Sequence, residues 1–138
     1  MRNTSLHRVL VDYGYAAAAT GNAVLIARIR RGRSAQLLRV PFSIAVPEEC
    51  AERAASYGAL QALLDALRSF GHRLATVVVP DRELLEDLRE HRALPYRLHR
   101  PYIHLLCSLR ATPTFVLELG RAEDLAELAR AELSRIAA

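Results

Sequence analysis

The sequence predicts an α/β fold with one mixed sheet of five strands and helices packed on its faces. Three observations support this class. The first third of the chain holds short, β-branched apolar runs separated by turn residues. After Pro47 the apolar residues recur at helical spacing. In the second half, helical stretches alternate with short apolar runs, as in parallel strands joined by helices. The expected element order is βββαβααβα, in one domain covering residues 1–138.

The three opening strands are expected to form an antiparallel meander. The first is predicted to end at Asp12 and Tyr13, because Gly14 and Gly21-Asn22 indicate turns. The run Arg31-Gly32-Arg33-Ser34 indicates a hairpin between the other two. Pro41 lacks an amide hydrogen for sheet pairing, so the third strand is expected at an edge. These strands are predicted at residues 7–13, 23–30 and 35–42.

Four helices and two further strands complete the expected fold. Pro47 suits the first position of a helix, and Gly71 ends that helix. Because the last two strands are reached through helices, we expect them to be parallel neighbours with right-handed crossovers. The strands are predicted at residues 74–79 and 114–119, and the helices at 47–70, from 81, near 99–110 and at 121–136.

The charge balance favours an anionic partner. The formal charge is +4, from 19 basic residues against 15 acidic ones, and every basic residue is Arg. Arg binds phosphate through two parallel hydrogen bonds, and a basic surface is common among nucleic-acid-binding proteins. A GC-rich genome also explains the missing Lys, although it does not explain the net positive charge.

Five arginines lie on the predicted hairpin of the second and third strands. Strand side chains return to the same face every two residues, so Arg28 and Arg30 share a face. The cluster is either a solvated charged face or a track for the phosphates of a duplex, which position a protein without reading base sequence. Its members are Arg28, Arg30, Arg31, Arg33 and Arg39.

The sequence also predicts a compartment. No apolar run approaches the roughly 20 residues of a membrane span, and no signal-peptide core precedes the first strand. Cys50 and Cys107 lack metal-binding or redox spacing and fit a reducing compartment as small apolar residues. We therefore expect a cytoplasmic protein with no membrane partner, and a homo-oligomer stays an open alternative.

Four short motifs occur in order along the chain: Val9-Leu10-Val11-Asp12-Tyr13-Gly14, Ala55-Ser56-Tyr57-Gly58-Ala59-Leu60, Val77-Val78-Val79-Pro80-Asp81 and Arg121-Ala122-Glu123-Asp124-Leu125-Ala126. Together with the element order, their spacing resembles the ribonuclease H-like superfamily, and type I ribonuclease H in particular. The resemblance covers residues 7–136. It implies the ribonuclease H fold, with a three-strand meander followed by two parallel strands.

The resemblance also implies a chemistry. In that family, carboxylates from strand ends and helix starts hold two Mg²⁺ ions beside the scissile phosphate. For this chain the resemblance implies Mg²⁺, or Mn²⁺ in its place, only if the site is active. Hard cations take oxygen ligands, and two ions stabilise both the attacking and the leaving oxygen. Asp12 and Asp81 correspond to the two strand-end ligands. An active enzyme would hydrolyse the RNA strand of an RNA–DNA hybrid with a metal-activated water.

The sequence departs from the family at its first helix. Ser56 stands where the family has its catalytic Glu, and a hydroxyl cannot supply the missing negative charge. Glu52 lies one turn earlier on the same helix face and would substitute if the helix start were shifted toward the metals. Glu123 and Asp124, in the last helix, are the candidate outer ligands.

Each acidic residue also has a structural interpretation. Asp81 precedes a helix and is a favoured N-cap residue. Glu123 and Asp124 lie in a first helical turn, where the helix dipole stabilises acidic side chains. The leading hypothesis is a ribonuclease H-like domain that binds nucleic acid with impaired catalysis. The alternative is a non-catalytic protein-interaction or dimerisation module on the same fold. Asp12-Tyr13-Gly14 also resembles the opening motif of Holliday-junction resolvases, without a downstream match.

Overall fold

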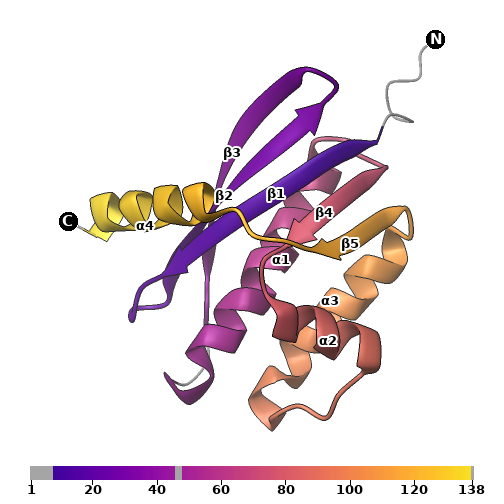
Figure 1. Cartoon of the computed structure of the whole chain (residues 1–138). Coiled ribbons are helices and arrows are strands. Elements are labelled where there is room, and N and C mark those ends of the chain that lie inside the picture. Colours follow the sequence, from indigo (N-terminus) through magenta and orange to yellow (C-terminus); the bar gives the residue numbers. More distant parts are fainter. Residues whose placement is uncertain (1–7, 46–47, 138) are drawn as a thin grey trace.

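The computed structural model describes residues 8–45 and 48–137, which form one five-stranded sheet flanked by helices (Figure 1). The strands are β1 (Val9–Ala17), β2 (Asn22–Arg31), β3 (Ser34–Ser43), β4 (Ala75–Val79) and β5 (Phe115–Leu119). The helices are α1 (Ala51–Ser69), α2 (Arg82–Glu90), α3 (His99–Ala111) and α4 (Glu123–Ala137), with short 3-10 turns at Glu48–Cys50 and Tyr96–Leu98.

The sheet has the strand order β3-β2-β1-β4-β5. The strands β1, β2 and β3 pair antiparallel, whereas β4 pairs parallel with both β1 and β5. The predicted fold class, element order and parallel pairs are therefore confirmed. Strand β3, which contains Pro41, lies at an edge as expected. The predicted helix start at Pro47 lies outside the described residues.

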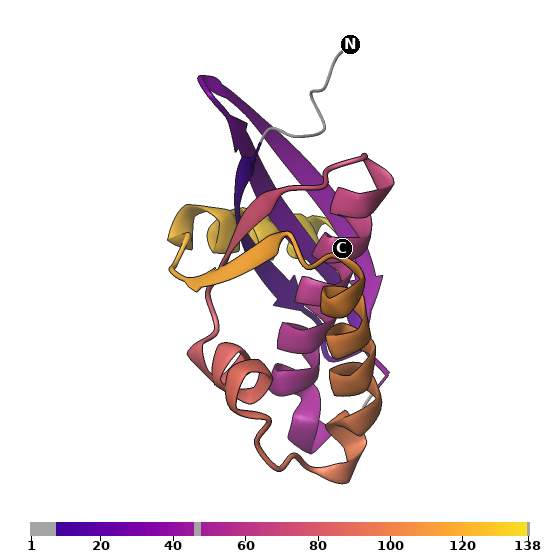
Figure 2. The same ribbon diagram turned by 90° about the vertical axis from the view of Figure 1, so that its right-hand side faces the viewer.

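Two layers of helices cover the sheet. Helices α1 and α3 run side by side on one face (Figure 2), and α1 buries Leu60, Leu63 and Leu64 against Val9 and Val11 of β1. Helix α4 crosses the other face over β1 and β2, where Leu125 and Ala129 pack on Val24 and Ile26. None of the helices in these two described stretches is long and apolar enough to cross a membrane.

Strand β1 is longer than predicted. It continues through Gly14 to Ala17, and these residues pair with Ile26 to Ala23 of β2. Gly14 therefore does not mark a turn. It lies under α4, where an added Cβ would come within 2.6 Å of the Cα of Ala126. The turn lies at the second predicted position, Gly21, whose φ of 97° favours glycine.

The close crossing of β1 and α4 makes a prediction about stability. We expect Gly14→Ala to lower the free energy of unfolding by about 1–3 kcal/mol or more, because the new methyl group meets helix backbone that cannot turn aside. The measurement is a urea unfolding midpoint. Gly32→Ala is the control, since a Cβ there meets nothing within 4 Å and costs only about 1–2 kcal/mol for its left-handed backbone. Equal losses in the two variants would contradict this account.

Candidate functional site

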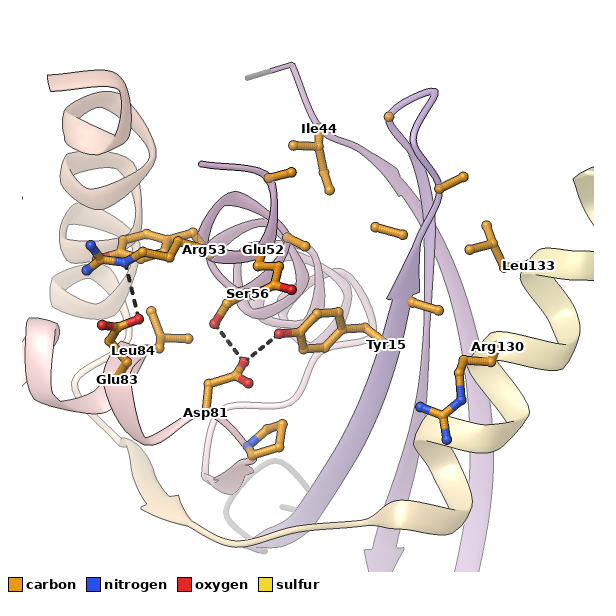
Figure 3. Close-up of a pocket in the computed structure, with 18 of the residues that line it drawn as sticks. Tyr15, Ile44, Glu52, Arg53, Ser56, Asp81, Glu83, Leu84, Arg130 and Leu133 are labelled. Atoms are coloured by element: carbon orange, nitrogen blue, oxygen red, sulfur yellow. Dashed lines mark hydrogen bonds and ion pairs between the residues drawn. The ribbon is translucent and has the colours of Figure 1, made fainter. Parts of the chain in front are cut away.

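A cleft of about 1800 Å³ opens at the end of the sheet where β1 and β4 finish (Figure 3). Its walls come from the β1–β2 turn, the first turns of α1 and α2, and the outer part of α4. In open α/β sheets, ligands bind outside the carboxyl ends of parallel strands. The cleft is therefore the candidate functional site.

Asp81 is the centre of the hydrogen bonding in this cleft. Its Oδ2 accepts a hydrogen bond of 2.6 Å from the Ser56 hydroxyl and one of 2.9 Å from the Tyr15 hydroxyl (Figure 3). Asp81 occupies the N-cap position of α2, yet its side chain makes no capping hydrogen bond. Its carboxylate therefore turns into the cleft and is not used to cap the helix.

The strand register explains why Tyr15 meets Asp81. Asp12 pairs with Val78 in the parallel β1–β4 ladder, so Tyr15 and Asp81 lie at the same level three residues further on. Side chains alternate between the faces of a strand. Tyr13 and Tyr15 therefore point toward α1, and Ser56 is a buried residue of that helix.

Tyr15 is a hydrogen-bond donor that does not ionise near neutral pH. Burial raises the pKa of its hydroxyl well above the ordinary tyrosine value, and the charge of Asp81 and the hydrogen bond to it raise the pKa further. The ring of Tyr13 stacks on that of Tyr15, with 6.4 Å between centroids. The pKa of the buried Tyr13 is raised as well, chiefly by burial. The Asp81 carboxylate is thus held by neutral hydroxyls.

The alternation of β1 directs Asp12 to the opposite face of the sheet. There its carboxylate pairs with Arg28 at 2.6 Å, and Arg28 also reaches Asp124 of α4 at 2.8 Å. The Arg28 hydrogen bond holds the pKa of Asp124 below its usual range. Asp12 thus has a structural role in joining β1, β2 and α4, which its position in an apolar strand did not suggest.

Two of the five predicted site carboxylates line the cleft. Asp81 and Glu52 do so, and the exposed Glu52 lies one turn before Ser56 in α1 (Figure 3). Glu123 is exposed in the first turn of α4 and is not part of the cleft lining. Asp12 and Asp124 belong to the Arg28 network on the other face.

A second polar group in the cleft wall was not predicted from the sequence. Asp87 is only 1% exposed and accepts hydrogen bonds from Arg53 at 2.7 Å and from the Tyr57 hydroxyl at 2.8 Å. Its place three residues after Leu84 on the apolar face of α2 could have indicated burial. This group ties α2 to α1 and so fixes the position of Asp81 at the start of α2.

The cleft does not offer the ligands that two divalent cations need. Across residues 8–45 and 48–137, no three His, Cys, Asp or Glu side chains gather in a way that could hold a metal ion. Asp81 Oδ2 already accepts two hydrogen bonds, and its neighbours Tyr15 and Ser56 bring neutral hydroxyls. Paired divalent cations call for several charged oxygen ligands, so this donor set does not fit them.

The predicted arginine cluster divides into two groups. Arg28 and Arg39 form ion pairs with Asp124 and Glu132 of α4. The other three are exposed and, among the described residues, have no ion pair. They lie at or beside the β2–β3 turn, and they are Arg30, Arg31 and Arg33.

This sheet, with α1 and α3 on one face and α4 on the other, defines a ribonuclease H-like fold related to type I ribonuclease H. Its structural relatives include ribonuclease H1 from the halophilic archaeon Halobacterium salinarum, with a TM-score of 0.67, 18% identity, and coverage of 91% of this chain and 98% of that one. The N-terminal ribonuclease H domain of rv2228c from Mycobacterium tuberculosis has a TM-score of 0.67 and 17% identity, with coverage of 96% and 99%.

A third relative was solved with a ligand. LC11 ribonuclease H1, isolated from compost by a metagenomic approach, in complex with an RNA–DNA hybrid has a TM-score of 0.62 and 12% identity, and the match covers 86% of this chain and 89% of that one. No protein-family model and no curated protein sequence matches this chain. At these identities the likeness establishes the fold.

The missing carboxylates make a prediction about metal binding. The double variant Tyr15→Asp/Ser56→Glu places two more carboxylates beside Asp81 and Glu52. We expect millimolar Mg²⁺ to raise its Tm by several degrees, since a ligand at 100 times its Kd stabilises the folded state by about 2.7 kcal/mol. The wild type and the neutral control Tyr15→Asn/Ser56→Gln should not respond beyond a matched NaCl control. Differential scanning fluorimetry measures the effect, and equal Mg²⁺ responses in all three proteins would contradict it.

The raised pKa of Tyr15 makes a prediction about alkaline stability. Unfolded tyrosine ionises near pH 10, whereas folded Tyr15 keeps its proton to higher pH. Above about pH 10 the unfolded state therefore binds fewer protons than the folded state, so the free energy of unfolding falls as pH rises. Tyr15→Phe removes this contribution, and its urea midpoint should fall less between about pH 9 and pH 11. Parallel pH profiles for the two proteins would contradict the assignment.

Proposed function

We propose that this chain is a ribonuclease H-like domain that binds nucleic acid without hydrolysing it through a pair of metal ions. The observation that carries the loss of hydrolysis is the pairing of Asp81 with the hydroxyls of Ser56 and Tyr15. Ser56 stands where type I ribonuclease H, which this sequence resembles, has a catalytic Glu. Tyr15 is the residue that β1 directs into the cleft. Asp81 Oδ2 thus accepts two hydrogen bonds from neutral hydroxyls, which supports a cleft that does not hold a pair of metal ions.

Nucleic-acid binding is supported by charge and by fold. The formal charge is +4, and exposed arginines near the β2–β3 turn have no carboxylate partner among the described residues. A relative of the same fold was solved with an RNA–DNA hybrid. We take an RNA–DNA hybrid or a duplex as the partner, in the cytoplasm, recognised by shape and backbone.

The test of hydrolysis uses a labelled RNA–DNA hybrid with Mg²⁺ and, separately, Mn²⁺. We expect no cleavage above buffer by the wild type, because the cleft lacks the charged ligands for two ions. Asp81→Asn is prepared in parallel to identify contaminating nuclease, which would cleave equally in both samples. Cleavage by the wild type that disappears in Asp81→Asn would overturn the proposal and leave Glu52 as the compensating ligand.

The test of binding uses the same hybrid without metal. We expect binding at about 50 mM salt that weakens by orders of magnitude at about 200 mM, because several phosphate contacts release counterions. Fluorescence anisotropy measures both affinities. No binding at the lower salt concentration would overturn nucleic-acid recognition and favour the protein-interaction or dimerisation module. The edge strand β3 would then be the surface through which the domain pairs with a partner.

A further inference from the structure

The end of the sheet opposite the cleft is formed by three separate segments. Parallel strands begin at the same edge, so the starts of β1 and β4 lie together. The β2–β3 turn lies there too, because Arg30 pairs with Leu10 in the β1–β2 ladder. Figure 1 shows the hairpin tip, the start of β1 and the start of β4 at the same end of the molecule, away from the end of β1.

Five exposed arginines gather on these segments, and we name this surface the basic pole. One precedes β1, three belong to the hairpin, and one lies in the α1–β4 loop. Among the described residues, none of the five forms an ion pair with a carboxylate. The basic pole consists of Arg8, Arg30, Arg31, Arg33 and Arg73.

Two contacts fix the outer members of the basic pole. The Arg8 guanidinium donates a hydrogen bond of 3.3 Å to the carbonyl oxygen of Ala75, which keeps it beside β4. The carbonyl oxygen of Arg73 accepts a hydrogen bond from the Thr114 hydroxyl, which anchors the loop before β4 to the segment before β5. The arginines therefore project from a scaffold tied to the sheet.

The basic pole is not balanced by acidic side chains. Asp65, near the end of α1, is already engaged with Arg68 at 3.4 Å. The acidic residues of the cleft (Glu52, Asp81, Glu83 and Asp87) lie at the other end of the sheet. The positive charge of the basic pole affects a neighbouring side chain: the pKa of His72 is lowered, first by burial and then by the charge of Arg31.

We propose that the basic pole is the surface on which this domain binds the phosphate backbone of a nucleic-acid duplex, at the end of the sheet opposite the cleft. This inference rests on the proposed function and names the surface that binds the nucleic acid. Guanidinium groups bind phosphate oxygens in pairs, and five of them spread over three segments can follow successive phosphates without contacting bases. Arg28 and Arg39 are excluded from this surface, because α4 already pairs with them.

The composition of the basic pole favours a duplex over a single strand. Proteins that bind single strands stack successive bases on several aromatic side chains, whereas the basic pole consists of arginines, which suit a phosphate backbone. Phe70, 61% exposed near Arg73, is the aromatic side chain that a single strand or a lipid bilayer would use.

Two variants with the same change of charge test this location. The pole variant is Arg30→Ala/Arg31→Ala/Arg33→Ala, and the cleft variant is Arg82→Ala/Arg121→Ala/Arg130→Ala. The three cleft arginines are also exposed and, within the described part of the chain, unpaired. Binding of a labelled RNA–DNA hybrid is followed by anisotropy across salt concentrations. Circular dichroism confirms that both variants fold.

The expected result is a specific change in the salt dependence. Five phosphate contacts predict a slope of log K against log salt of about −4.5, and two remaining contacts predict about −1.8. The pole variant should therefore bind more than about tenfold more weakly at low salt, with the shallower slope. The cleft variant should keep both the affinity and the slope of the wild type. Phe70→Ala should likewise bind the hybrid as the wild type does.

Three results would overturn the inference. If the cleft variant loses affinity and the pole variant does not, the duplex lies in the cleft, and the proposed function stands without the basic pole. If Phe70→Ala weakens binding as much as the pole variant, the surface binds a single strand whose bases stack on Phe70. If phosphatidylserine vesicles bind more tightly than the hybrid, the ligand of the basic pole is a lipid surface. If the wild type binds no hybrid at about 50 mM salt, the proposed function itself fails.

Discussion

Strand β1 is hydrogen-bonded to β2 on one side and to β4 on the other, and the strict alternation of its side chains organises the whole molecule. Tyr13 and Tyr15 project toward α1, whereas Asp12 and Gly14 project toward α4. A one-residue change of register would exchange the two sets. The central strand therefore decides which side chains reach the cleft and which secure α4.

On the α4 face, the alternation places charges where they stabilise the fold. The Arg28 guanidinium bridges Asp12 and Asp124, and so joins two strands to the first turn of α4. Gly14 lets α4 approach β1 closely. The Asp12 pair is partly buried, and removing one partner of such a pair leaves a charge without compensation. An acid in a buried strand thus has a packing role that needs no metal.

On the α1 face, the same alternation brings a hydroxyl to the carboxylate at the start of α2. The hydroxyls of Tyr15 and Ser56 donate to Asp81 Oδ2 at 2.9 and 2.6 Å, while Arg53 and Tyr57 donate to Asp87 Oδ2 behind it. Each of these two carboxylates is thus held through one oxygen, and Asp87 Oδ1 stays buried without a hydrogen-bond partner among the described residues. The unpaired positive charge of the basic pole lies at the opposite end of the sheet. The scaffold thus places the cleft with its hydrogen-bonded carboxylates and the basic pole at opposite ends of the sheet.

The fold could be predicted from the sequence, because hydrophobic periodicity and turn residues are local properties. The order βββαβααβα, the parallel pairs and the edge position of β3 with Pro41 followed from them. The resemblance to ribonuclease H and the exposed position of the hairpin arginines Arg30, Arg31 and Arg33 were also accessible.

The site itself was decided by tertiary structure. The sequence predicted that β1 ends at Asp12 and Tyr13, because glycine is common in turns. Only the close crossing of α4 explains why the strand continues through Gly14. The partner of Asp12 was equally hidden, because Arg28 is distant in sequence and meets it only through the β1–β2 register. Sequence patterns fix which residues form strands and helices. Register and helix crossing, which depend on residues far apart in the chain, fix which side chains meet.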